Sequence, residues 1–243
     1  MKAWGLTDVG NIRKQNQDHF AIEKLSSDCI IAVVCDGMGG AKAGNVASKL
    51  ATEIFIQEVQ SSYRPTMSIE AAEVMLRHSV STANQAVFEQ AEMSVDFRGM
   101  GTTLVAAYVT PTTAIFANVG DSRGYILNET GISFMTVDHS QVEFMVRRGD
   151  ITRQQAMHHP QKNFLTRALG TDGKISTDVY RQPLGEGDAI LLCSDGLSNV
   201  VTDQEMIFEV VYGVQKEGCC QSLLKIAKDR GAPDNVTVLL VTL

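Results

Sequence analysis

The clearest pattern in the chain is a set of continuous apolar runs that end at aspartate-glycine pairs. Residues 29–35 are apolar without interruption and lead into Asp36-Gly37, and residues 189–193 lead, through one serine, into Asp195-Gly196. Uninterrupted apolar runs of this length are typical of strands buried on both faces. A last apolar run covers residues 236–243. The pattern therefore predicts buried strands that carry carboxylates at their ends.

Helical spacing alternates with these runs. Apolar residues recur every three or four positions over 43–55 and again over 72–91, which predicts two helices with one apolar face each. Residues 203–211 and 219–228 show a similar pattern near the end of the chain. We expect four helices, and each of them needs a sheet or another helix against which to bury its apolar face.

The middle of the chain favours antiparallel hairpins. Its β-prone runs are short, with turn residues between them, and they cover Thr102–Thr110, Thr113–Val119, Arg123–Leu127 and Ile132–Thr136. Such close spacing leaves no room for helical crossovers between parallel strands. Residues 138–170 are polar and charged, and we expect short helices and irregular structure there. The whole pattern predicts an α+β fold of two packed antiparallel sheets with helix pairs outside, formed by a single domain over residues 1–243.

Composition narrows the range of functions. Hydrophobic residues make up 44% of the chain, charged residues 20%, and the formal net charge is -7. An acidic chain is a poor candidate for binding nucleic acid, which needs basic surface. Five cysteines without a CxxC spacing, and no apolar run long enough to cross a bilayer, predict a cytoplasmic protein without membrane contact. We expect a monomer.

The aspartates are the candidate chemistry. Asp36 and Asp195 each precede a glycine, Asp234 precedes the last apolar run, Asp121 lies between two predicted strands, and Asp18 lies near the start. Each alone is more typical of a turn, because aspartate bonds its own backbone there. Together they weigh differently, because the Asp36, Asp195 and Asp234 loops contain no lysine or arginine, and a cluster of carboxylates without basic partners is what Mg²⁺ and Mn²⁺ require. Spacing alone does not decide whether these loops converge.

Arg13 is the second candidate. It lies five residues before Asp18. A guanidinium beside a metal site can hold a phosphoryl group through two parallel hydrogen bonds. An isolated loop arginine is more often simply solvated.

The motifs, taken in order, identify a family. The chain resembles the type 2C (PPM family) metal-dependent protein serine/threonine phosphatases, and in particular their small bacterial members. The resemblance runs from end to end and rests on Thr7-Asp8-Val9-Gly10, Asn16-Gln17-Asp18, Val33 to Gly40, Gly99-Met100-Gly101-Thr102-Thr103, Asn118 to Arg123, Asp138-His139-Ser140, Leu165 to Gly170, Cys193 to Leu197 and Asp234-Asn235-Val236-Thr237. It implies a four-layer αββα sandwich with the metal site at one edge of the two sheets.

The resemblance also implies a set of metal ligands. Asp36 is expected to bridge two ions, Asp195 and Asp234 to complete the first ion, and the backbone carbonyl of Gly37 to bind the second. Bacterial members often take a third ion, for which Asp121 and Asp195 are the matching positions. The expected cofactors are therefore two or three Mn²⁺ or Mg²⁺ ions per chain.

Other positions take roles outside direct ligation. Asp18 is expected to act through metal-bound water, and Arg13 to hold the substrate phosphate. Met38 stands where animal members carry a histidine proposed as general acid, and Gln17 where they carry a glutamate. Both replacements are usual in bacterial members, and they leave the general acid unassigned. His139 is the nearest motif histidine, and we expect it to be structural.

The expected reaction is direct hydrolysis of phosphoserine or phosphothreonine. A hydroxide bridging two ions would attack phosphorus in line, while the metals and the arginine stabilise the developing charge. A pseudophosphatase is the alternative from another class, but the metal-site aspartates are all present. The expected partners are phosphoprotein substrates, with a bacterial serine/threonine kinase favoured over a sporulation or stress-response partner switch.

Residues 140–170 are expected to form a flap beside the site. The segment contains Arg147, Arg148, Arg153, His158 and His159. A solvated, mobile loop is one interpretation and contact with substrate is the other.

Overall fold

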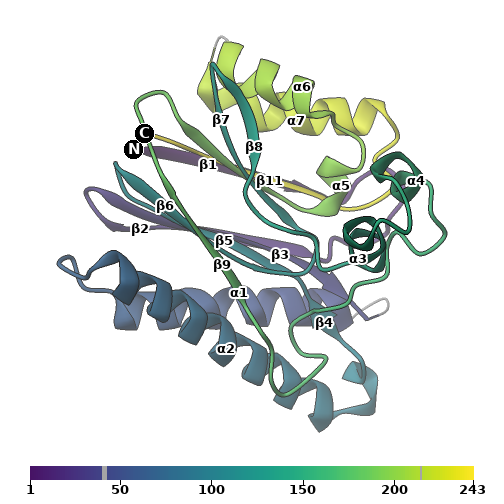
Figure 1. Ribbon diagram of the computed structural model, residues 1–243. Coiled ribbons are helices and arrows are strands. Elements are labelled where there is room, and N and C mark those ends of the chain that lie inside the picture. The colour runs from purple at the N-terminus through teal and green to yellow at the C-terminus, as the bar shows by residue number, and fades with distance from the viewer. Residues whose placement is uncertain (40–42, 214) are drawn as a thin grey trace.

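The computed structural model describes residues 1–39, 43–213 and 215–243 and has two antiparallel sheets stacked between layers of helix (Figure 1). Gly40, the last residue of the glycine-rich motif, lies outside the described residues. The α+β class and the αββα sandwich predicted from the sequence are confirmed.

The first sheet contains both ends of the chain. Its strands pair antiparallel throughout, with β1 and β8 at the edges. In spatial order they are β1 (Lys2–Asp8), β11 (Val236–Thr242), β10 (Ala189–Cys193), β7 (Arg123–Asn128) and β8 (Gly131–Phe134).

The second sheet is also antiparallel, and β2 and β9 form its edges. The short strand β4 (Gly101–Thr102) pairs with the end of β3 beside this sheet. In spatial order the strands are β2 (Asp18–Ser26), β3 (Cys29–Met38), β5 (Leu104–Val109), β6 (Thr113–Val119) and β9 (Asp178–Pro183).

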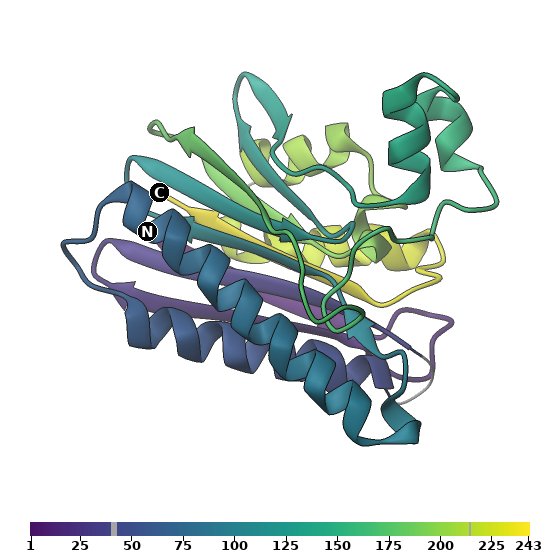
Figure 2. The ribbon, with the colours of Figure 1, turned by 60° about the horizontal axis from the view of Figure 1, so that its bottom comes forward.

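Helices cover the outer face of each sheet. The second sheet packs against α1 (Ala43–Ser62) and α2 (Ile69–Met93), which lie side by side in Figure 2. The first sheet packs against α6 (Asp203–Ile207), the π-helical turn η2 (Phe208–Tyr212) and α7 (Lys216–Asp229). Shorter helices lie between the layers or beside them: η1 (Val95–Phe97), α3 (Gln141–Arg148), α4 (Arg153–Met157) and α5 (Asp195–Ser198).

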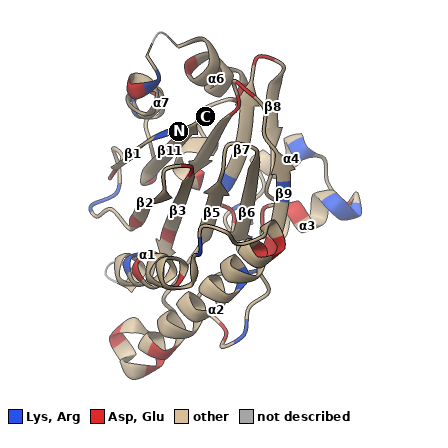
Figure 3. Ribbon diagram, turned by 90° about the vertical axis from the view of Figure 1, so that its left-hand side faces the viewer, with Lys and Arg blue, Asp and Glu red and all other residues tan. Residues whose placement is uncertain are grey.

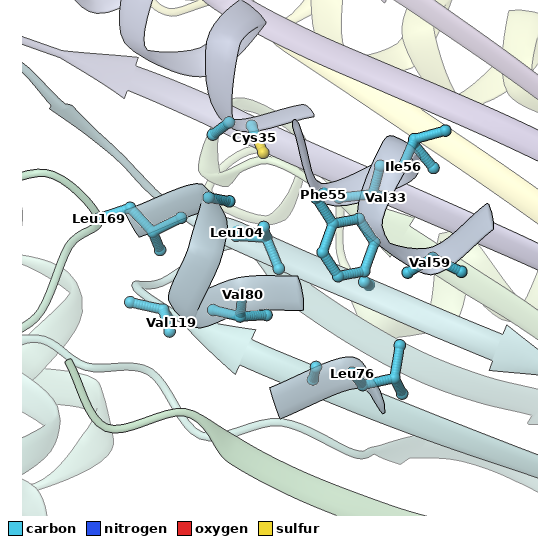
Figure 4. Packing of buried hydrophobic residues seen from close by; sticks show 14 of the residues in the cluster. Val33, Cys35, Phe55, Ile56, Val59, Leu76, Val80, Leu104, Val119 and Leu169 are labelled. Atoms are coloured by element: carbon cyan, nitrogen blue, oxygen red, sulfur yellow. The ribbon is translucent and has the colours of Figure 1, made fainter. Parts of the chain in front are cut away.

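The packing of strand β3 explains why residues 29–35 are apolar without interruption. Ile31, Val33 and Cys35 point toward α1 and α2, where Figure 4 shows Val33 and Cys35 among the packed side chains. The alternate residues, Ile30 and Val34, pack between the two sheets. Because successive side chains in a strand point to opposite faces, a strand covered on both sides must be apolar throughout. The predicted strand buried on both faces is confirmed.

Three strands were not expected, and all of them are edge strands. β1, β2 and β9 consist almost entirely of half-buried or exposed residues, with polar positions among them, so they lack the continuous apolar signal of β3. The predicted strand over 102–110 is also divided in two at Thr103, whose backbone N–H donates to Asp36 O at 2.8 Å and so leaves the regular ladder.

The predicted helix over 203–211 changes its winding. It is α-helical only to Ile207 and continues as η2. The carbonyls of Val210 and Val211 accept hydrogen bonds from Lys216 Nζ, which offers them a partner outside the helix. The spacing of apolar residues does not reveal the hydrogen bonds from Lys216 to this turn, so it predicted a regular helix here.

The five cysteines are buried free thiols. Burial raises the pKa of the Cys35, Cys193 and Cys219 thiols to about 12 and that of Cys220 to about 11. These side chains therefore act as small apolar residues, as the sequence predicted for Cys35. Among the described helices, none combines the length and the apolar character needed to cross a bilayer.

Candidate active site

A cavity of about 790 Å³ lies at one end of the sandwich, where β3 and β10 end. Asp36, Asp121, Asp195 and Asp234 all line it. These aspartates come from both sheets and from distant parts of the chain. The convergence that the spacing could not decide is thus present in the structure.

The Asp36 side chain is held at the end of β3 by its own backbone. Its N–H donates to Thr103 Oγ1 at 2.9 Å, and its carbonyl accepts from the Thr103 N–H and the Thr102 hydroxyl. The next residue must be glycine, because a Cβ on Gly37 would lie 2.0 Å from the carbonyl oxygen of Gly44. The close approach of α1 to this strand therefore fixes where Asp36 and the Gly37 backbone meet the cavity.

Asp18 lies behind the cavity. It opposes Asp36 in the β2–β3 register and is almost fully buried. Its Oδ2 accepts hydrogen bonds from Ser194 Oγ at 2.7 Å and Thr237 Oγ1 at 2.6 Å, while Oδ1 has no partner among the described residues. Burial raises the pKa of Asp18 to about 7, and the charges of Asp195 and Asp234 act in the same direction.

Asp121 follows a tight turn that His139 supports. Gly120 has φ +107°, a region that residues with a Cβ rarely adopt. The N–H of Gly120 donates to His139 Nδ1 at 3.1 Å, and the N–H of His139 donates to Gly120 O at 2.9 Å. Since Nδ1 accepts, the ring proton sits on Nε2, which lies 3.1 Å from Asp178 Oδ2. His139 therefore holds the Gly120 turn through two hydrogen bonds, as a structural residue, and it does not line the cavity.

Asp195 and Asp234 complete the acidic floor of the cavity. Asp195 is the first residue of α5; its Oδ2 accepts from Asn199 Nδ2 at 3.1 Å, and its Oδ1 is buried without a partner in the described chain. Asp234 Oδ1 accepts from the N–H of Asn235. Arg13 Nη2 lies 2.7 Å from Asp234 Oδ2. The acidic loops contain no basic residue of their own. The positive charge beside Asp234 is that of Arg13, which lies 221 positions earlier in the chain.

Asn235 attaches the Arg13 segment to the Asp234 loop. Its Oδ1 accepts from the N–H of Gln17 at 2.8 Å, and its Nδ2 donates to the carbonyls of Val9 at 2.9 Å and Gln15 at 3.0 Å. The residue is nearly fully buried. The Asn235 side chain therefore holds both ends of the loop that carries Arg13.

The electrostatics of the cluster suit a divalent cation. Burial raises the pKa of Asp36, Asp121 and Asp195, and neighbouring carboxylates raise each of them further, although the cavity leaves all three side chains partly accessible. Carboxylates that repel one another in a poorly solvated site regain their charge when a cation binds. Within the described residues no three acidic, histidine or cysteine side chains already surround one point. Mg²⁺ needs only one or two carboxylates with water, so the donors present fit such an ion.

Several residues of the site carried no separate signal in the sequence. Ser194, Thr237 and Asn235 lie within the family motifs, but their hydrogen bonds to Asp18 and to the Arg13 loop depend on contacts between distant strands. The cavity wall also includes residues from the segment between α4 and β9: Asn163, Phe164 and Leu165.

Comparisons with known proteins agree with this geometry. The family model described as protein phosphatase 2C matches residues 12–223. A serine/threonine phosphatase, stp, of Listeria welshimeri is 39% identical over 237 residues, covering 97% of this chain and 93% of that protein. Protein phosphatase PhpP of Streptococcus pneumoniae is 32% identical, with 98% and 96% covered.

Solved structures show the same likeness. The serine/threonine phosphatase Stp1 of Staphylococcus aureus superposes with a TM-score of 0.94 at 36% identity, covering 100% of this chain and 94% of that one. The Mycobacterium tuberculosis phosphatase PstP/Ppp gives 0.88 at 31% identity, with 100% and 98% covered. The chain therefore belongs to the protein phosphatase 2C family and is a metal-dependent serine/threonine protein phosphatase.

Proposed function

We propose that the aspartates of the cavity hold two or three divalent cations, Mn²⁺ or Mg²⁺. In this assignment Asp36, Asp195 and Asp234 would hold the first ion, Asp36 and the Gly37 carbonyl would hold the second, and Asp121 with Asp195 would hold a third. The observation that supports it is the convergence of these carboxylates on one cavity, where burial and neighbouring carboxylates raise the pKa of Asp36, Asp121 and Asp195. Bound ions would neutralise the phosphoryl charge and lower the pKa of water enough to make it a nucleophile.

The residues of the chain itself position the substrate and the ions. Asp18 lies behind Asp36 with one carboxylate oxygen held by two hydroxyls, so the other oxygen is free to accept from water in the site. Arg13 would turn from Asp234 toward the phosphoryl oxygens and hold them through its paired N–H groups. Met38 lines the cavity but carries no titratable proton, so the leaving group takes its proton from elsewhere.

The substrates we propose are phosphoserine and phosphothreonine proteins, with a bacterial serine/threonine kinase and its targets favoured. Free, buried thiols support action in the cytoplasm. We further propose that residues 1–243 act as one domain and as a monomer.

Substitution of Asp36 tests the metal assignment. Asp36→Ala should abolish hydrolysis of a phosphothreonine peptide and remove at least one Mn²⁺ from the binding isotherm measured by calorimetry. Asp28→Ala is the matched control, since Asp28 is an exposed aspartate at the other end of the same β2–β3 hairpin. EDTA should stop the wild-type reaction. Near-normal turnover and metal binding by Asp36→Ala would contradict the assignment.

A further inference from the structure

The lining of the cavity combines three kinds of chemistry. It includes the loop of Arg13, Lys14 and Gln15, the apolar flap residues Phe164 and Leu165, and the acidic cluster. A phosphorylated residue that reaches the cluster brings its neighbours in the peptide close to the other lining residues, some of them basic and some apolar.

Phe164 is an exposed aromatic side chain on a well-held backbone. Its relative exposure is 62%. Its N–H donates to Gln161 O at 3.1 Å, its carbonyl accepts from the N–H of Gln141 at 2.8 Å, and Leu165 bridges to Ser140. An exposed aromatic ring whose backbone is already ordered loses little entropy when a ligand covers it. Burial of the Phe164 ring against an apolar group of a ligand should therefore make the free energy of binding more favourable.

The arginines of the flap are already engaged. Arg147 and Arg153 pair with Glu143, and Arg148 pairs with Asp150. Arg148 also lies over the ring of Phe144, 5.4 Å from its centre. Figure 3 shows blue basic residues on α3 and α4, and these helices lie to one side of the layers in Figure 2. None of these arginines lines the cavity. The flap residues that do reach the mouth are Asn163, Phe164 and Leu165.

We propose that Phe164 is a specificity-determining residue that contacts an apolar side chain directly after the phosphorylated residue of a peptide substrate. The proposal rests on the proposed function, because it takes the acidic cluster as the phosphate site. Contact between the ring and a leucine would favour such peptides by about fivefold in kcat/KM, the equivalent of roughly 1 kcal/mol. The contribution of the flap to substrate choice is then mainly apolar.

Two phosphothreonine peptides that differ only at the residue after the phosphothreonine, leucine in one and serine in the other, test the proposal. The wild-type protein should prefer the leucine peptide by about fivefold, mostly through KM. Phe164→Ala should reduce that ratio to near one, and Phe164→Leu should restore most of it. Phe144→Ala is the matched control: Phe144 is 51% exposed on the same flap but does not line the cavity, so the ratio should persist.

The possible failures are distinguishable. A wild-type protein that hydrolyses both peptides without preference, or a preference that survives in Phe164→Ala, overturns the role of Phe164 and leaves the proposed function standing. Failure of the wild-type protein to hydrolyse either peptide with Mn²⁺ present overturns the proposed function itself, and the role of Phe164 with it.

Discussion

Replacing Arg13 should tighten metal binding while it weakens catalysis. In the structure its guanidinium lies 2.7 Å from Asp234 Oδ2, where a metal ion is expected, and Asp234 raises the pKa of Arg13. An ion that uses this oxygen must displace the guanidinium. With the two side chains 52% and 31% exposed, the pair falls among surface ion pairs, which are worth about 0.2–1 kcal/mol. Removing the competitor in Arg13→Ala should therefore raise Mn²⁺ affinity about 1.4-fold to 5-fold.

Titration calorimetry with Mn²⁺ at low ionic strength measures this effect directly. Lys14→Ala is the matched control, because it removes one positive charge from the same loop and the same cavity wall but leaves the Arg13–Asp234 contact in place. Turnover of a phosphopeptide by Arg13→Ala should fall, since the phosphoryl group loses its guanidinium partner. Metal affinity that is unchanged, or no higher than that of Lys14→Ala, would refute the competition between Arg13 and the metal.

Two further predictions concern the supports of the site. Asn235→Ala should lower the free energy of unfolding by roughly 2–4 kcal/mol, because three buried hydrogen bonds are lost, and should lower Tm by roughly 4–16 °C in a thermal scan; an unchanged Tm would show that the bonds are dispensable. Burial lowers the pKa of His139 below 6.5 despite Asp178, and Arg167 acts in the same direction as burial. As the pH falls, His139 is therefore protonated in the unfolded chain before it is protonated in the folded chain. The stability that neutral His139 contributes is complete above about pH 6.5 and is lost as the pH falls toward the pKa of His139 in the folded protein. His139→Gln should flatten that part of the pH profile in urea unfolding, and parallel profiles for the two proteins would contradict the reasoning.

The strands that carry the site were predictable because they are buried on both faces. Residues 29–35 of β3 and all of β10 are apolar, and Asp36 and Asp195 follow these two runs directly or after one serine. The long helices α1 and α2 were predictable for a similar reason, since one broad apolar stripe persists over many turns. The edge strands β1, β2 and β9 were not found, because half of their surroundings is solvent and their patterns are correspondingly mixed.

Residue types indicated the acidic site, but its internal contacts depend on the fold. The family motifs placed Asp36, Asp195 and Asp234 in the site, and the structure brings all three to one cavity. Neither motif nor spacing predicted that Arg13 pairs with Asp234, because these residues meet only when β1 and β11 align. Local patterns report burial and turn chemistry, whereas a hydrogen bond between distant segments depends on how the layers stack.

The hydrogen bonds to Asp18 link the distance between the two sheets to the position of a carboxylate beside the acidic cavity. Asp18 belongs to β2 in one sheet, while Ser194 and Thr237 follow or belong to strands of the other. The apolar side chains that set the spacing, such as Phe116 and Leu239, lie between the sheets. A core substitution that leaves the protein folded but separates the sheets by a fraction of an ångström would stretch bonds of 2.6 and 2.7 Å. The packing of the interior therefore sets the position of the Asp18 carboxylate as well as the stability of the fold.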